Sequence, residues 1–117
     1  MNIAALSNDQ GPFEPAKIAK PLRTTVAELA DSLGLGLDAV QRKDRVASVK
    51  VQTRLREFVE LLNIMEPRMG SLLMAYAWLR SEPLSGWGRR TAMDMIKEGR
   101  ARYVHDYIDS VDAGIYA

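Results

Sequence analysis

The sequence predicts an all-α protein, a small bundle of about six helices in a chain of 117 residues. In several segments apolar residues recur every three to four positions, which is the spacing of one face of an α-helix. No segment alternates apolar and polar residues with the period of two that a half-buried strand requires. Glycine and proline divide the chain into pieces of helical length with short connections, which favours helices packed against their sequence neighbours.

Composition is that of a folded protein and excludes several kinds of site. Hydrophobic residues make up 47% and charged residues 26% of the sequence, which is ordinary for a small domain. There is no cysteine, so disulfides and cysteine metal sites are excluded. His105 is the one histidine, and a single histidine cannot hold a metal ion. With no Ser/His/Asp cluster and no glycine-rich phosphate loop, we expect a protein without catalytic residues, metal or cofactor.

The sequence also shows no signal for export or membrane insertion. The N-terminus has no basic segment followed by the apolar run of a signal peptide. No apolar run approaches the ~20 residues that a membrane-spanning helix needs. We therefore expect a cytoplasmic protein that has no membrane partner.

Residues 1–23 are expected to form a flexible or loosely packed N-terminal arm. Pro12, Pro15 and Pro21 lie within ten positions, and the apolar residues of the segment follow no clear period. Proline inside a helix removes a hydrogen bond and clashes with the preceding turn. Such a segment is typical of a chain end, although it could also lie across a partner subunit.

The first clear helix is predicted to begin at Thr25, because Thr25 and Glu28 match the S/T-x-x-E capping box. The apolar residues that follow share one helix face: Val26, Leu29, Ala30 and Leu33. Gly34 is expected to end this helix in the left-handed conformation. A short second helix is predicted from Leu37 to about Asp44, with Val40 facing inward.

Four further helices are predicted, over about 49–65, 67–80, 90–97 and 100–113. Ser48 is a suitable N-cap for the first of these, because its hydroxyl can accept a hydrogen bond from a backbone N–H. Pro67 interrupts the apolar pattern and is expected in the first turn of the next helix. Pro83 and Gly86 mark the following turn, and Gly114 is expected to cap the last helix.

The first two predicted helices have the spacing of a helix-turn-helix. Ala30 is small enough for a close helix crossing, Gly34 allows the turn, and Val40 fills the crossing. Between residues 42 and 56 there are six basic residues and a single acid, a charge that suits a phosphate backbone. The predicted DNA-binding residues have side chains of types that read bases or phosphates: Asp38, Gln41, Arg42, Lys43 and Arg45. A plain helical hairpin with a solvated basic face is the alternative.

The end of the chain has the opposite charge. From Tyr103 onward there are three acids, Asp106, Asp109 and Asp112, and no lysine or arginine. Their spacing of three places them on one helix face, which suits a basic partner surface or is simply a solvated face. A basic middle and an acidic end are compatible with a different partner at each.

The C-terminal half combines three motifs that resemble one known domain. Residues 77–86 read A-W-L-R-S-E-P-L-S-G, residues 92–99 read A-M-D-M-I-K-E-G, and the chain ends D-S-V-D-A-G-I-Y-A. With these motifs the chain, from about residue 24 onward, resembles the Xre/MbcA/ParS antitoxins. That family pairs a degenerate Xre-like helix-turn-helix with a C-terminal toxin-binding domain, and often has a proline where this chain reads Trp87-Gly88-Arg89-Arg90.

The resemblance implies a helix-turn-helix and dimerisation region over residues 24–66 and a toxin-binding domain over residues 67–117. It also implies an antitoxin of a RES-Xre type II toxin–antitoxin system. Such a protein forms a homodimer and binds its cognate RES-domain toxin, an enzyme that attacks NAD, in a hetero-oligomeric complex that blocks the active site. The antitoxin or the complex also represses its own operon by binding operator DNA. The alternative is a stand-alone helix-turn-helix regulator whose C-terminal domain serves only dimerisation.

Toxin contacts are expected on the turn near residue 87 and on the last helix. Aromatic residues and arginine are enriched among the residues that dominate interface energies. The candidates are Trp87, Arg89, Arg90, Tyr107, Val111, Ile115, Tyr116 and Ala117. Trp78, Tyr103 and Ile108 are instead expected in the core. Ile115 could equally pack back on Ile108 or Val111, as an apolar residue after a glycine cap often does.

Overall fold

A computed structural model describes residues 12–114. Between these residues the chain forms eight α-helices and one 3-10 helix and no β-strand, which confirms the all-α prediction. The elements are α1 (Pro15–Ala19), η2 (Lys20–Leu22), α2 (Val26–Ser32), α3 (Leu37–Gln41), α4 (Lys43–Val46), α5 (Val49–Met69), α6 (Leu72–Ser81), α7 (Ala92–Lys97) and α8 (Ala101–Asp112). More helices are present than the six expected, because the predicted arm contains α1 and η2 and the helix predicted over 37–44 is divided into α3 and α4.

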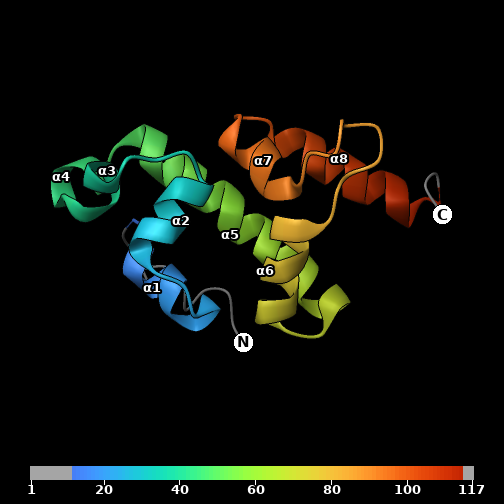
Figure 1. Cartoon of the computed structure of the whole chain (residues 1–117), viewed down its shortest axis with the longest axis horizontal. Helices are drawn as coiled ribbons and strands as arrows, with labels where there is room; N and C mark the ends of the chain where they lie inside the picture. The colour runs from blue at the N-terminus through green and yellow to red at the C-terminus, as the bar shows by residue number, and fades with distance from the viewer. Residues whose placement is uncertain (1–11, 115–117) are drawn as a thin grey trace.

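Helix α5 is the longest helix and runs through the middle of the molecule (Figure 1). Helices α1 to α4 lie toward one end of α5, and α7 and α8 lie toward the other. The apolar side chains of α5 recur at helical spacing, so one face of α5 is buried along most of its length. A single hydrophobic core results, which extends from Ile18 near the N-terminus to Ile108 on α8.

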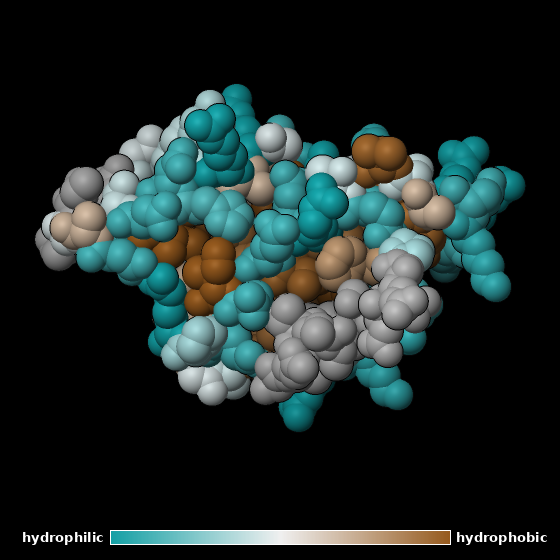
Figure 2. Space-filling model, turned by 180° about the vertical axis from the view of Figure 1, so that it is seen from behind, coloured by the Kyte–Doolittle hydropathy of each residue, from teal (hydrophilic) through white to brown (hydrophobic). Residues whose placement is uncertain are grey.

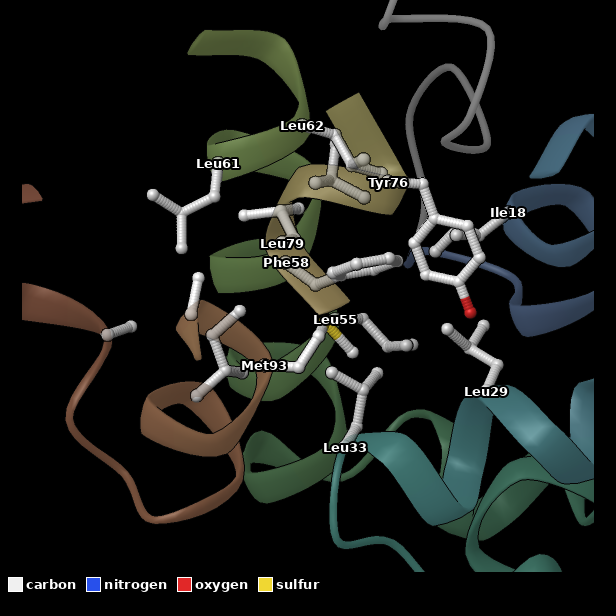
Figure 3. Close-up of a cluster of buried hydrophobic side chains, with 14 of the residues drawn as sticks. Ile18, Leu29, Leu33, Leu55, Phe58, Leu61, Leu62, Tyr76, Leu79 and Met93 are labelled. Carbon is white, nitrogen blue, oxygen red and sulfur yellow. The ribbon is translucent and has the colours of Figure 1, made fainter. Parts of the chain in front are cut away.

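The centre of this core joins the predicted N-terminal and C-terminal regions. Figure 3 shows Leu33 at the C-terminal end of α2, Phe58 of α5, Leu79 of α6 and Met93 of α7 converging on the same space. The Phe58 ring meets the ring of Tyr76 edge-on, with centroids 5.8 Å apart. Aromatic pairs prefer this geometry. The two regions therefore share one core.

The prediction of a loosely packed arm is wrong for residues 15–22. These residues form α1 and η2, and Ile18 and Leu22 are buried in the core. The prolines do not prevent this, because Pro15 and Pro21 each lie in the first turn of a short helix, where a missing N–H costs little. Gln52 of α5 fixes the chain just before α1: its amide accepts from the Phe13 N–H at 2.7 Å and donates to the Phe13 carbonyl at 3.0 Å.

The prediction that Pro67 opens a new helix is also wrong. Helix α5 continues through Pro67 to Met69 and ends at Gly70, which has φ +94°. The missing N–H of Pro67 lies in the last turn of α5, so it interrupts only the end of the hydrogen-bond ladder. Ser71 then caps α6, with its hydroxyl accepting from the Met74 N–H at 3.1 Å.

Other predicted helix ends are confirmed. The Thr25 hydroxyl accepts from the Glu28 N–H at 3.0 Å, and Ser48 caps α5 in the same way. Gly34 and Gly114 both adopt positive φ, at +70° and +82°, one residue beyond Leu33 and Ala113, the C-caps of α2 and α8. The sequence therefore encodes most of the helix limits locally, through side-chain caps and left-handed glycines.

The C-terminal ends of α2 and α7 meet at Arg54. The Arg54 guanidinium donates through Nη1 to the carbonyl of Leu33 at 2.6 Å and to the carbonyl of Lys97 at 2.9 Å. A Cβ at Gly34 would lie 2.9 Å from Cγ of Lys97. The turn after α2 therefore requires glycine for its backbone conformation and for the space it leaves to α7.

Replacing Gly34 with alanine is expected to destabilise the fold by more than the same change at Gly70. Both positions have positive φ, which costs an alanine about 1 kcal/mol, but a Cβ at Gly70 meets nothing within 4 Å. Urea unfolding of Gly34→Ala, with Gly70→Ala as the matched control, measures the additional cost of moving Lys97. Equal losses would show that the Lys97 side chain moves aside freely.

Candidate protein-binding surface

The connection from α6 to α7 is an ordered loop with an unusual backbone. Gly86, Gly88 and Arg89 have φ of +84°, +61° and +67°. Leu84 is buried and anchors the loop, and its N–H donates to the Arg90 carbonyl at 2.9 Å. A left-handed conformation at a non-glycine residue such as Arg89 costs about 1 kcal/mol and occurs often at functional sites. The side chain of Arg89 is exposed.

The side chain of Arg90 holds this loop in place. Its Nε lies 2.9 and 3.1 Å from the two carboxylate oxygens of Glu98, after the end of α7. Its Nη1 donates to the Trp87 carbonyl at 3.3 Å. Arg90 therefore stabilises the loop through hydrogen bonds within the molecule. Arg89 and Arg90 were both predicted to contact a toxin, and Arg90 is the one whose side chain bonds to Glu98 and Trp87.

Trp87 connects the loop to α8. The Trp87 ring is half-buried and packs against the ring of Tyr103, with centroids 5.1 Å apart. Tyr103 is 47% exposed, so the expectation that it belongs to the core is wrong. Tyr103, Tyr107 and Val111 follow at intervals of four and so lie along one side of α8. We call the four residues Trp87, Tyr103, Tyr107 and Val111 the α8 stripe.

Part of the α8 stripe borders a groove of about 180 Å³ at the end of the molecule. Its lining comes from the last turns of α5, from α6 and from α8: Met65, Arg68, Met69, Trp78, Tyr107, Ile108 and Val111. Ile108 is buried as expected, whereas Trp78 is half-buried and lines the groove. Figure 2 shows hydrophobic surface between hydrophilic side chains on the face opposite that of Figure 1. The groove is predominantly apolar, and methionine and aromatic side chains adapt well to a partner.

An ion pair holds the last turn of α8 to the end of α5, beside the groove. Arg68 donates to both carboxylate oxygens of Asp112, at 2.5 and 2.8 Å. These hydrogen bonds raise the pKa of Arg68, with a further contribution from the charge of Asp109, and they lower the pKa of Asp112. The bidentate geometry fixes the direction in which the end of α8 points.

Replacing Asp112 with asparagine is expected to lower stability at neutral pH and to have little effect in acid. Because the folded pKa of Asp112 is below its ordinary value, its stabilisation is present above that value and is lost as the pH falls through the lowered pKa. Thermal unfolding at pH 7 and at about pH 3 measures the difference. Asp106→Asn, on the same helix, is the control. An unchanged difference between wild type and Asp112→Asn across this range would contradict the assignment.

The predicted recognition helix over residues 37–44 is not continuous. Helix α3 ends at Gln41, Arg42 is extended with φ −91° and ψ 123°, and α4 begins at Lys43. Arg42 pairs with Asp44 across the break at 3.7 Å. The five predicted DNA-binding side chains are all exposed but belong to two short helices and the residue between them. The prediction of a single recognition helix over these residues is therefore wrong.

Ile115, Tyr116 and Ala117, which were also predicted to contact a toxin, lie outside the described part of the chain. Within residues 12–114 no set of three or more histidine, cysteine, aspartate or glutamate side chains is arranged to hold a metal ion. None of the helices in the same range has the length and apolar character needed to cross a bilayer.

Comparison with models of protein families found a match for the C-terminal part of the chain. Residues 69–114 match the family model described as the antitoxin Xre/MbcA/ParS C-terminal toxin-binding domain. The matched range begins at the end of α5 and includes α6, the loop, α7 and α8, and so contains the whole α8 stripe. Searches of curated proteins and of solved structures found no match. The family match supports an antitoxin role with a toxin protein as the partner.

Proposed function

We propose that this chain is the antitoxin of a RES-Xre toxin–antitoxin system and neutralises a RES-domain toxin by covering its NAD-degrading active site. The observation that carries the proposal is the match of residues 69–114 to a toxin-binding domain. The identity of the toxin as a RES-domain enzyme rests on the motifs of the C-terminal half and their resemblance to this antitoxin family. The α8 stripe and the loop before α7 are the proposed contact surface.

The physical character of this surface suits binding to a protein. Aromatic side chains such as Trp87 and Tyr103 offer large contact areas and lose little conformational entropy on binding. The ion pair of Arg90 with Glu98 and the buried Leu84 hold the loop in one conformation before a partner arrives. Such preorganisation lowers the entropic cost of association.

The proposal is tested by co-expressing the chain with the product of the adjacent open reading frame. We expect that product to arrest growth when expressed by itself, with loss of cellular NAD, and growth to recover when this chain is present. A neighbour that is not toxic, or that stays toxic beside this chain, overturns the proposal. A homodimer and a hetero-oligomeric complex are expected from sedimentation of the purified components.

We also propose that the chain represses its own operon through the basic surface at α3 and α4. Support comes from the exposed side chains of Lys43 and Arg45, close to Lys50, which is also exposed. Replacing Lys43 with alanine is expected to reduce the slope of log affinity against log salt by about 1, if Lys43 contacts a phosphate. A gel shift with DNA from upstream of the gene provides the measurement. Absence of binding at low salt excludes DNA binding and the alternative function as a stand-alone regulator.

A further inference from the structure

Arg89 occupies a position in the loop before α7 where the backbone favours glycine. Its φ is +67°, and within residues 12–114 only Arg89 and Arg23 combine a side chain with positive φ. The Arg89 side chain is exposed and forms no ion pair or hydrogen bond with another described residue. The fold therefore gains no contact from this side chain that would offset the cost of its backbone conformation.

Arg23 shows that a left-handed conformation does not by itself mark a binding position. It ends η2 with φ +56°, and its N–H donates to the Lys20 carbonyl at 3.1 Å, as in a helix cap. Arg89 differs from Arg23 in its surroundings. It lies two residues after Trp87, whose ring packs on Tyr103, and the Tyr103 side chain is 47% exposed. Tryptophan, tyrosine and arginine are the residue types enriched at the energetic centres of interfaces.

The charges around the aromatic pair favour an anionic partner. Arg90 and Arg100 both approach the carboxylate of Glu98, at 2.9 and 3.9 Å, so two arginines share one acid. With Arg89, three arginines stand against one glutamate, a net charge of +2. The side chains of Arg90, Arg100 and Glu98 remain between one-third and one-half exposed, so this charge reaches the surface.

The other charged residues from Glu82 to Asp106 do not cancel this excess. Asp94 and Lys97 line the same depression and carry opposite charges. Asp106 lies four residues after Arg102 on α8, so these two charges also offset each other. Glu82, at the end of α6, is the remaining acid. The positive charge is therefore concentrated on the loop and at the start of α8.

From these observations we infer that the surface formed by Trp87, Arg89 and Tyr103 receives a carboxylate of the toxin that lies beside an apolar side chain. The Arg89 guanidinium pairs with the carboxylate, whose two oxygens match its planar fork, and the aromatic rings pack against the apolar side chain. The inference rests on the proposed function, because the partner is the toxin, and it adds the chemistry of the toxin surface. A nucleic acid suits this surface less well, because phosphate backbones are bound by many cations rather than by one beside an apolar stripe.

The test uses the full chain and the purified product of the adjacent gene, with affinity measured over a range of salt. Arg89→Gly is expected to weaken binding about tenfold at low salt, and Arg89→Glu about 100-fold, because a second carboxylate would then face that of the toxin. Both differences are expected to shrink as salt rises. The Tm of Arg89→Gly is expected to be no lower than that of the wild type, since glycine adopts positive φ without strain.

Arg23→Gly is the matched control. It makes the same substitution at the other left-handed arginine, at the end of η2, which lies between α1 and α2 and so toward the opposite end of α5 from α8 (Figure 1). Its Tm is expected to change as little as that of Arg89→Gly, while its affinity for the toxin stays that of the wild type.

Each outcome has a distinct meaning. If the wild-type chain does not bind the neighbouring product, the proposed function fails and the inference with it. If the wild type binds and Arg89→Gly binds equally well, the inference is overturned while the proposed function stands. Equal affinities of Arg89→Gly and Arg89→Glu would show that no carboxylate faces this position, and a Tm of Arg89→Gly well below that of Arg23→Gly would show that Arg89 serves the fold. If Arg89→Gly leaves toxin binding intact and weakens the gel shift with upstream DNA, the partner of this surface is a nucleic acid and the inference is again overturned.

Discussion

Replacing Phe58 with alanine is expected to destabilise the protein by about 3–5 kcal/mol, the range for removing a fully buried phenylalanine ring. Phe58 is completely buried at the centre of α5, and its ring contacts Tyr76 of α6 edge-on. The change removes apolar burial and leaves a cavity between the two helices that make the most extensive contact in the fold. Because domains of this size are stable by only about 5–15 kcal/mol, a large share of the total is lost.

Thermal and urea unfolding monitored by circular dichroism measure this effect, and a loss of about 10–20 °C in Tm is expected. Met74→Ala is the control, because Met74 lies on α6 but is 55% exposed, and its loss is expected to stay below about 1 kcal/mol. A Phe58→Ala variant as stable as Met74→Ala would mean that α5 and α6 do not pack as described.

The helix ends show how much of the fold is encoded locally. The capping hydroxyls of Thr25 and Ser48 and the left-handed glycines Gly34 and Gly114 could be identified from the sequence, because each acts within four residues of its own position. A further signal was present and unused: Thr91 and Asp94 form a capping box at the start of α7. It places the start of α7 at Ala92 rather than at Arg90.

The predictions that were wrong concern segments whose local structure is determined by tertiary contacts or carries no sequence signal. Prolines in residues 12–21 predicted a loose arm, yet Ile18 is completely buried, because α1 packs against α2 and η2 packs against α6. Pro67 predicted a helix start, whereas α5 tolerates it in its last turn and ends at Gly70. The break at Arg42 has no glycine or proline to mark it, so the local sequence gives no signal for dividing the predicted recognition helix.

The candidate surface was predictable in part. Helical periodicity places Tyr107 and Val111 on one side of α8, and turn chemistry exposes the loop that carries Trp87. The contact between Trp87 and Tyr103 could not be predicted, because it joins two elements that are separated by α7. The position of Tyr103 could have been predicted, however. Because Tyr103 lies four residues before Tyr107, helical spacing places it on the same side of α8 as Tyr107 and Val111 rather than in the core.

Replacing Trp87 with alanine is expected to weaken toxin binding about 30-fold or more, which corresponds to the loss of at least about 2 kcal/mol at an interface hot spot. The half-buried Trp87 ring contacts Tyr103 and the hydrophobic core and leaves part of its surface exposed, at the junction of the loop and α8. The Trp87→Ala and Tyr103→Ala losses are expected to be non-additive, since each ring supports the position of the other. The affinities of both single variants and of the double variant for the purified toxin, compared with that of the wild type, form a double-mutant cycle that measures this coupling.

Leu37→Ala is the control for this cycle, because Leu37 is an exposed apolar residue on α3, far along the molecule from α8 (Figure 1). Unfolding curves for every variant separate loss of fold from loss of contact, which matters because Trp87 also packs against the core. If Trp87→Ala is folded and binds the toxin like the wild type, the loop before α7 lies outside the interface. The ordered backbone of Gly86, Gly88 and Arg89 would then serve the fold rather than the partner, and the contact would have to be sought on Tyr107 and Val111 at the other end of the stripe.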